Sequence, residues 1–163
     1  MNITALDQII TEGYRQSEQG TRTGDTAAEL AAIRTYIQTA GRIVVPNHNN
    51  DKITVINEVL AEFSLRCAEH LCIPTTAPDQ TRMPAVSKAL LALDITGADL
   101  VIARGRLGIP GSGSMLVIMD TRGRILSAAL SPPHIIHQKT VPDAVRGELE
   151  EALSRIGFRK KQS

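Results

Sequence analysis

The sequence has very few aromatic side chains: its 163 residues include two Phe, two Tyr and no Trp. Proteins that bind single-stranded nucleic acid rely on aromatic rings on which the bases stack, and strong binding to the phosphate backbone needs an excess of basic residues. Here 18 Lys and Arg are balanced by 17 Asp and Glu, for a net charge of +1. The composition therefore argues against nucleic-acid binding, and the core must be built from Leu, Ile, Val and Ala.

Long apolar runs are also missing. No stretch approaches the ~18 apolar residues of a membrane-spanning helix, and the first residues, with Asp7 and Glu12, lack the pattern of a secretory signal peptide. The two cysteines, Cys67 and Cys72, are five residues apart, so in an extended segment their side chains point to opposite faces and cannot form a disulfide. We expect two free, buried thiols and a soluble cytoplasmic protein with no membrane partner.

Several catalytic motifs are absent as well. The sequence contains no G-x-S-x-G, no H-E-x-x-H and no context typical of a catalytic cysteine. It also lacks the G-x-x-x-x-G-K-[ST] pattern of a P-loop. Covalent catalysis is therefore not indicated, and any phosphate site must be of another kind.

The most informative segment is residues 98–120, ADLVIARGRLGIPGSGSMLVIMD. Its two apolar runs, Leu100–Ala103 and Met115–Met119, are short and rich in Val and Ile, which is typical of buried strands. Residues 104–114 between them include two arginines, four glycines and two serines. Glycines allow backbone N–H groups to approach a ligand closely, and arginines supply forked donors for phosphate or carboxylate. We interpret the segment as an anion-binding loop; a wide hairpin loop with solvated arginines is the alternative.

A second candidate site is the turn Pro46–Lys52, between a short apolar strand and an amphipathic helix. It offers Asn47, Asn49 and Lys52 at the expected start of the helix. The N-terminus of a helix binds phosphate readily, because its first N–H groups are free and carry partial positive charge. The alternative is a plain asparagine-rich turn with an exposed lysine.

Three further polar residues lie in the segment SPPHIIHQK: His134, His137 and Lys139. The two prolines predict a loop, and no cysteine or carboxylate pattern completes a zinc site there. A ligand-contacting or structural role is favoured over metal chelation.

Asp120 ends a predicted strand and is expected beside the glycine-rich segment. It is the best-placed carboxylate for Mg²⁺, which prefers oxygen ligands and usually shares them with substrate phosphates. The alternative is that Asp120 starts the tight turn at residues 121–124.

Strands alternating with helices predict an α/β fold with a mixed, twisted sheet flanked by helices. We expect a single domain over residues 1–163, with N-terminal helices in 1–40 and an α/β core in 42–158. The expected helices lie at residues 2–17, 26–40, 52–64, 84–94 and 142–156, the strands at 42–46, 66–73, 100–103, 115–119 and 125–130, and loops at 74–83 and 131–140.

Two segments resemble the inosine-triphosphate pyrophosphatase fold. Residues 43–52 are similar to its first strand and phosphate-binding turn, whose Ser/Thr-x-Asn-x-x-Lys pattern is matched by Asn47, Asn49 and Lys52, with Asn47 replacing the hydroxyl residue. Lys88 falls on the lysine of its Asn-Ala-x-x-Lys-Ala helix, although a lone basic residue is usually exposed. Residues 103–107, ARGRL, fall where that family has its catalytic acids, and both acids are absent. The resemblance implies a site that binds nucleotide phosphates without activating water efficiently.

Over residues 10–158 the chain is similar to the HcgB family of methanogenic archaea, above all in residues 98–120 and in ILSAALSPPHIIHQK. The resemblance implies a guanylyltransferase of iron-guanylylpyridinol (FeGP) cofactor biosynthesis, the cofactor of a hydrogenase. It implies transfer of GMP from GTP to the hydroxyl group of a pyridinol with release of pyrophosphate. Mg²⁺ as cofactor, a homodimer and an inosine-triphosphate-pyrophosphatase-like fold are implied in the same way.

Under this hypothesis the candidate residues have three roles. The expected catalytic residues are Lys52, Arg104, Arg106 and His137. The residues expected to bind the nucleotide or the pyridinol are Asn47, Asn49, Lys88, Gly111, Ser112, Gly113, Ser114 and Lys139. Asp120 is the expected Mg²⁺ ligand. Two alternatives stay open: a nucleoside-triphosphate pyrophosphohydrolase, in which water is the acceptor, and a non-catalytic nucleotide-binding module.

Overall fold

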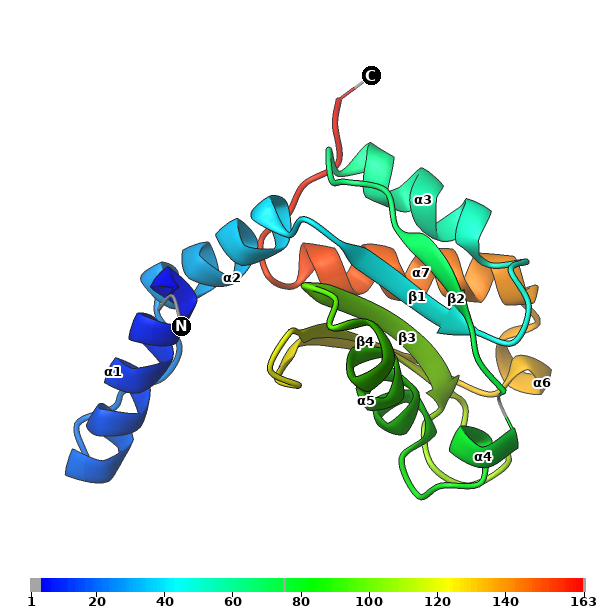
Figure 1. The fold of residues 1–163 in the computed structure, drawn as a ribbon, viewed down its shortest axis with the longest axis horizontal. Helices are drawn as coiled ribbons and strands as arrows, with labels where there is room; N and C mark the ends of the chain where they lie inside the picture. The colour runs from blue at the N-terminus through cyan, green and yellow to red at the C-terminus, as the bar shows by residue number, and fades with distance from the viewer. Residues whose placement is uncertain (1–3, 75, 163) are drawn as a thin grey trace. The chain divides into compact units, whose positions relative to one another are not determined.

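The computed structural model describes residues 4–74 and 76–162. They pack as two compact units that divide between Thr39 and Ala40. The first unit holds helices α1 (Ala5–Gln19) and α2 (Ala27–Thr39), and the second holds the sheet with the helices that follow (Figure 1). Whether the two units act as the single domain expected from the sequence stays a prediction.

Both helices of the first unit begin at a side-chain cap. The Thr4 hydroxyl accepts a hydrogen bond from the Asp7 backbone N–H at 3.1 Å, and the Asp7 carboxylate accepts one from the Thr4 N–H at 3.0 Å. Thr26 and Glu29 form the same reciprocal pair, so the helix expected over residues 26–40 also begins with a capping box. Residues 2 and 3, where the first helix was expected to begin, lie outside the described residues.

The second unit is built around a five-stranded mixed sheet with the order β2-β1-β3-β4-β5. The strands are β1 (Ile43–Asn47), β2 (Glu69–Cys72), β3 (Leu100–Arg106), β4 (Ser114–Asp120) and β5 (Ile125–Ser131). β1 pairs in parallel with β2 and β3, whereas β3, β4 and β5 pair antiparallel. This topology confirms the predicted mixed α/β fold.

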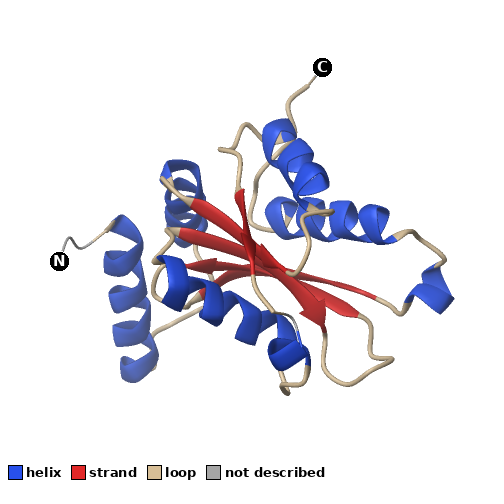
Figure 2. Cartoon of the chain, turned by 45° about the vertical axis from the view of Figure 1, so that its right-hand side comes forward, coloured by secondary structure: helices blue, strands red, loops and turns tan. Residues whose placement is uncertain are grey.

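Helices cover both faces of the twisted sheet (Figure 2). On one face, α5 (Pro84–Thr96) packs against β1, β3 and β4. On the other, α7 (Val141–Ser154) packs against β4, β5 and α3 (Ile53–Glu62). None of the helices in the described ranges is long and apolar enough to cross a membrane.

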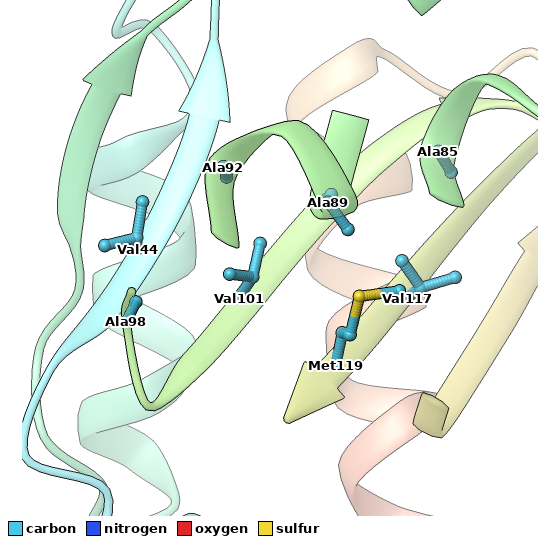
Figure 3. Close-up of a cluster of buried hydrophobic side chains, with 9 residues drawn as sticks. Val44, Ala85, Ala89, Ala92, Ala98, Val101, Val117 and Met119 are labelled. Carbon is cyan, nitrogen blue, oxygen red and sulfur yellow. The ribbon is translucent and has the colours of Figure 1, made fainter. Parts of the chain in front are cut away.

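Alternate residues of the central strands face the two helical layers. Val101 and Val117 lie in the cluster that packs against Ala85, Ala89 and Ala92 of α5 (Figure 3). The residues between them in the strands, including Ile102, Leu116 and Ile118, are buried as well. A strand covered on both faces is apolar at successive positions, which is why these runs could be recognised from the sequence.

Two segments expected to be loops each contain one helical turn, so the expectation of irregular structure is wrong there. α4 (Thr76–Asp79) lies in the first and α6 (His134–His137) in the second. The prolines that suggested loops are compatible with short helices, because Pro133 occupies the N-cap position of α6, where a missing N–H is harmless.

The cysteines confirm one expectation and contradict another. Cys67 and Cys72 are free thiols, as predicted, but both are exposed rather than buried. The reason is that β2 is shorter than expected and lies at the edge of the sheet, with Cys67 outside it.

The connections define where a ligand can enter the sheet. The chain leaves β1 into α3 on one face, whereas it enters β3 from α5 on the opposite face. The carboxyl ends of these neighbouring parallel strands therefore lie at a topological switch point, the usual position of ligand sites in α/β sheets. In Figure 1, α4 and α6 lie at this same edge.

Candidate active site

A cleft with a volume of about 530 Å³ lies at the carboxyl ends of β1 and β3. Segments far apart in the sequence meet there, so the fold assembles the site rather than any single motif. The lining residues are Asn47, His48, Asn49, Lys52, Asp79, Lys88, Arg104, Gly105, Arg106, Gly111, Gly113, Ser114, Pro132, Pro133 and His134.

The cleft is strongly cationic. Lys52, Lys88, Arg104 and Arg106 line it, and Asp79 is the one carboxylate among the described lining residues. Burial lowers the pKa of Lys52, and the positive charge of Arg104 lowers it further. Burial also lowers the pKa of Lys88, with an opposing contribution from Asp79. These cations repel one another, and a ligand with several negative charges would relieve the repulsion.

Lys88 is a structural part of the cleft wall. Its side chain is 6 % exposed, and its Nζ donates a hydrogen bond to the backbone carbonyl of Arg104 at 2.9 Å. The carboxylate of Asp79 lies 4.0 Å from the same Nζ. The expectation that a lone basic residue here is exposed is therefore wrong, because α5 carries Lys88 beneath the end of β3.

The guanidinium group of Arg104 is paired with a carboxylate on α7. Its Nε donates to Oε1 of Glu148 at 2.8 Å, and its Nη2 donates to Oε2 of Glu148 at 3.2 Å. The same Nη2 donates to the hydroxyl of Ser114 at 2.9 Å. The alternative of a solvated Arg104 is therefore wrong: this arginine is paired on one side and lines the cleft on the other.

One N–H group of the Arg106 guanidinium has no hydrogen-bond partner among the described residues. Its Nη2 donates to the backbone carbonyl of Asp79, which ties β3 to α4. Its Nε is buried and has no hydrogen-bond partner within residues 4–74 and 76–162. A buried N–H without a partner is costly, and an anionic oxygen in the cleft would satisfy it.

The hairpin between β3 and β4 needs glycine at two positions. Gly113 has φ +92°, and a Cβ there would lie 2.3 Å from the backbone oxygen of Ser131. Gly111 has φ +96° but open space around it. Ser112 does not line the cleft; its hydroxyl donates to the Ile109 carbonyl at 2.6 Å and shapes the loop.

The histidine segment contributes a different residue from the one expected. His134 lines the cleft, whereas His137 and Lys139 do not. The two imidazole rings are in contact, with centroids 4.9 Å apart. The backbone of Lys139 holds both rings, since its carbonyl lies 2.9 Å from Nδ1 of His134 and its N–H donates to Nδ1 of His137 at 3.3 Å. His137 thus contacts the cleft residue His134 without lining the cleft itself.

Asp120 lies at the wrong end of the sheet for this site. β4 runs from Ser114 in the cleft to Asp120 beside Leu100, roughly 20 Å away for six residues of strand. The Asp120 carboxylate is fully buried, and it accepts hydrogen bonds from Nε of Arg124 at 2.6 Å and from the backbone N–H of Arg122 at 3.0 Å. The expected position beside the glycine-rich segment is therefore wrong, and Asp120 closes the β4–β5 turn.

Two acidic residues of the site were not predicted from the sequence. Asp79 lies in a segment without a recognisable motif. Glu148 could have been recognised from the sequence. It follows Val145 by three residues and precedes Leu149 on α7, so its carboxylate lies on the apolar face of the helix. A charged residue at such a position is almost never buried without a partner.

The comparison with known protein families agrees with this geometry. The family model of the FeGP cofactor biosynthesis protein HcgB, a guanylyltransferase, matches residues 6–158. The matched span covers most of the 163-residue chain and includes every residue that lines the cleft. The chain therefore belongs to the HcgB family of guanylyltransferases, nucleotidyltransferase enzymes of FeGP cofactor biosynthesis.

Proposed function

We propose that the protein transfers GMP from GTP to the hydroxyl group of a pyridinol, with release of pyrophosphate, in the cleft at the ends of β1 and β3. The observation that most supports this proposal is the convergence of Lys52, Lys88, Arg104 and Arg106 on one cleft. Phosphoryl and nucleotidyl transfer depend mainly on positioning and on stabilisation of phosphate charge. A cluster of fixed cations next to a glycine-rich hairpin supplies both.

The reaction needs little acid–base chemistry from the protein. The pyridinol oxygen attacks the α-phosphorus of GTP, and the bond from that phosphorus to the oxygen bridging to the β-phosphate breaks. Pyrophosphate leaves with the electron pair, and the hydroxyl proton passes to solvent. Lys52, Arg104 and Arg106 would neutralise the charge that develops on the leaving group. An aromatic hydroxyl is acidic enough that a strong general base is unnecessary.

Mg²⁺ is the proposed cofactor, and the donor set suits an ion that arrives with the triphosphate. The structure, in the part of the chain it describes, contains no group of three or more His, Cys, Asp or Glu that could hold a metal alone. Mg²⁺ in nucleotide sites is commonly held by one or two carboxylates together with substrate phosphates. Asp79 would be that carboxylate, and the ion when bound would neutralise phosphate charge.

The same cleft is poorly equipped for the alternative reaction, hydrolysis of a nucleoside triphosphate. Activation of water at such sites uses paired carboxylates and metal. Here Asp79 is the one carboxylate among the described residues that line the cleft, so it has no second carboxylate to form such a pair. We therefore favour a pyridinol over water as the acceptor.

The test is incubation of purified protein with GTP, Mg²⁺ and a pyridinol, with pyrophosphate and the nucleotide product both quantified. We expect pyrophosphate and guanylylated pyridinol in equal amounts. Pyrophosphate together with free GMP would show a pyrophosphohydrolase instead. Binding of GTP without turnover, whatever the acceptor, would show a non-catalytic nucleotide-binding module.

We also propose that the protein works as a homodimer, as its resemblance to the family implies. Support comes from Ile135 and Ile136 on α6, which are 85 % and 72 % exposed directly after the cleft residue His134. Exposed apolar side chains grouped in this way often mark a surface covered by a partner. Sedimentation of the purified protein tests the proposal, and a monomer at the enzyme's working concentration would overturn it.

A further inference from the structure

Glu148 is a buried charge to which the proposed reaction gives no role. It lies on α7, is 1 % exposed, and does not line the cleft. An ionised carboxylate is retained in such a place only when other groups pair it and satisfy its oxygens. Arg104 and Ser114 do this here.

The three side chains form a closed set of hydrogen bonds between α7, β3 and β4. Arg104 donates from Nε to Oε1 of Glu148 at 2.8 Å and from Nη2 to Oε2 at 3.2 Å. The Ser114 hydroxyl donates to the same Oε2 at 2.7 Å and accepts from Nη2 of Arg104 at 2.9 Å. Two-point pairing of this kind fixes the plane of a guanidinium group.

The pairing leaves one amino group of Arg104 unused. Its Nη1 makes no hydrogen bond to any residue that the structure describes, and Arg104 lines the cleft. The backbone of Arg104 is fixed as well, because its carbonyl accepts the hydrogen bond from Lys88. Arg104 is therefore pre-organised before any ligand arrives.

We propose that Glu148 is a positioning residue of the transfer reaction: with Ser114, it clamps the Arg104 guanidinium in the orientation that leaves Nη1 for the phosphates in the cleft. The proposal rests on the proposed function, because it assigns Arg104 to the phosphates of the same reaction. Glu148 acts only through Arg104.

Positioning and simple electrostatics predict different effects of Glu148→Gln. If Glu148 acted only through its charge, its neutralisation would strengthen binding of a polyphosphate, because a negative charge next to the site disappears. If Glu148 positions Arg104, the amide weakens the clamp, because only one of its two polar atoms can accept. Misplacement of a catalytic group by about 1 Å can cost on the order of 100-fold in rate.

The first experiment is a double-mutant cycle with the pyridinol, GTP and Mg²⁺. We expect Glu148→Gln to lower kcat by about 10- to 100-fold with little change in the KM for GTP. We expect Glu148→Gln to have almost no further effect on kcat in an Arg104→Lys background, because a lysine has no planar guanidinium group for Glu148 to orient. Multiplicative effects of the two substitutions would overturn the proposal. Glu151→Gln, one turn along the same helix and exposed, is the matched control and should behave as wild type.

A second experiment does not depend on catalysis. In wild-type protein the Arg104 Nε–H is expected to exchange slowly with solvent, and Glu148→Gln should accelerate this exchange while the melting temperature shows an intact fold. Inorganic pyrophosphate should bind the variant no more tightly than wild type. Unchanged exchange, or tighter pyrophosphate binding, would overturn the clamp. Absence of GMP transfer by the wild-type protein would instead refute the proposed function, so the two failures are distinguishable.

Discussion

Lys88 on α5 donates a hydrogen bond from its Nζ to the backbone carbonyl of Arg104 on β3, at a distance of 2.9 Å. The bond joins the helix that precedes β3 to the end of the strand that places both arginines in the cleft. The carboxylate of Asp79, on α4, lies 4.0 Å from the same nitrogen. One buried lysine thus connects three walls of the site.

Replacement of Lys88 by Met should weaken the binding of GTP and leave the free energy of unfolding almost unchanged. The variant keeps the length of the side chain and removes the ammonium, so we expect the affinity for GTP to fall about tenfold, since a hydrogen bond to a charged group contributes about 1.5–3 kcal/mol. The free energy of unfolding should change little, because the cost of burying the charge disappears with its hydrogen bond. Calorimetric titration with GTP and thermal unfolding measure the two effects. Lys161→Met, at an exposed position of the C-terminal tail, is the control, and equal GTP affinity in the two variants would exclude a binding role for Lys88.

The affinity for pyrophosphate should weaken at a lower pH than ordinary lysines would allow. Burial lowers the pKa of Lys52 and of Lys88 below the usual 10.5, and Arg104 adds to the shift at Lys52. As pH rises through the lowered pKa values, the ammonium charges are lost and the anion loses partners, so binding declines before pH 10.5 is reached. Titration of pyrophosphate at a series of pH values from neutral to 10.5 measures the decline.

The same shifts have the opposite effect on the ligand-free protein. Between the lowered pKa values and 10.5, the unfolded state binds more protons than the folded state, so these two lysines make the free energy of unfolding rise with pH in that window.

For the pH dependence of pyrophosphate affinity, Lys52→Arg is the control, because a guanidinium stays protonated throughout. Its pyrophosphate affinity should persist to higher pH, and a profile identical to that of wild type would show that Lys52 does not contribute.

The two positive-φ glycines of the hairpin should differ in their tolerance of alanine. Gly111→Ala meets open space, so its cost is backbone strain of about 1–2 kcal/mol. Gly113→Ala has the same strain, and its Cβ would lie 2.3 Å from the backbone oxygen of Ser131, which cannot move without shifting β5. We expect a loss of about 3 kcal/mol or more for Gly113→Ala. Denaturant unfolding compares the pair, and equal losses would contradict the close approach of the two backbones.

The parts of the fold that could be predicted are those in which burial repeats along the chain. Leu100–Ala103 and Met115–Met119 were recognisable because both faces of the sheet are covered. The ends of these strands were not, because β3 continues to Arg106 only through its pairing with Ser114. Polar residues held in a ladder by a neighbouring strand have no local signature.

The site was predictable where it follows a strand end directly and unpredictable where tertiary packing supplies it. Lys52 and Arg104 meet in one cleft because β1 and β3 are parallel neighbours. Asp79 reaches the cleft through a single helical turn, whereas Glu148 does not line the cleft and instead reaches Arg104 from α7. The prediction placed Asp120 beside the glycine-rich segment, but β4 is long enough to put this residue at the opposite end of the strand. Residues that are close in sequence can lie far apart in space when they stand at opposite ends of the same strand.

Asp79 and Asp120 provide a direct test of where the proposed Mg²⁺ would bind. Asp79→Asn removes the carboxylate that lines the cleft, so the Mg²⁺ concentration for half-maximal turnover should rise by about 10- to 100-fold. Asp120→Asn leaves the Mg²⁺ dependence unchanged, because the carboxylate lies at the far end of β4, but it breaks a buried pair with Arg124 and should lower the free energy of unfolding by about 3 kcal/mol. Magnesium titrations of turnover and thermal unfolding of both variants measure these effects. A shift of the Mg²⁺ requirement in Asp120→Asn with none in Asp79→Asn would mean that the ion binds away from the cationic cleft, and the assignment of the phosphates to Lys52 and Arg104 would then fail with it.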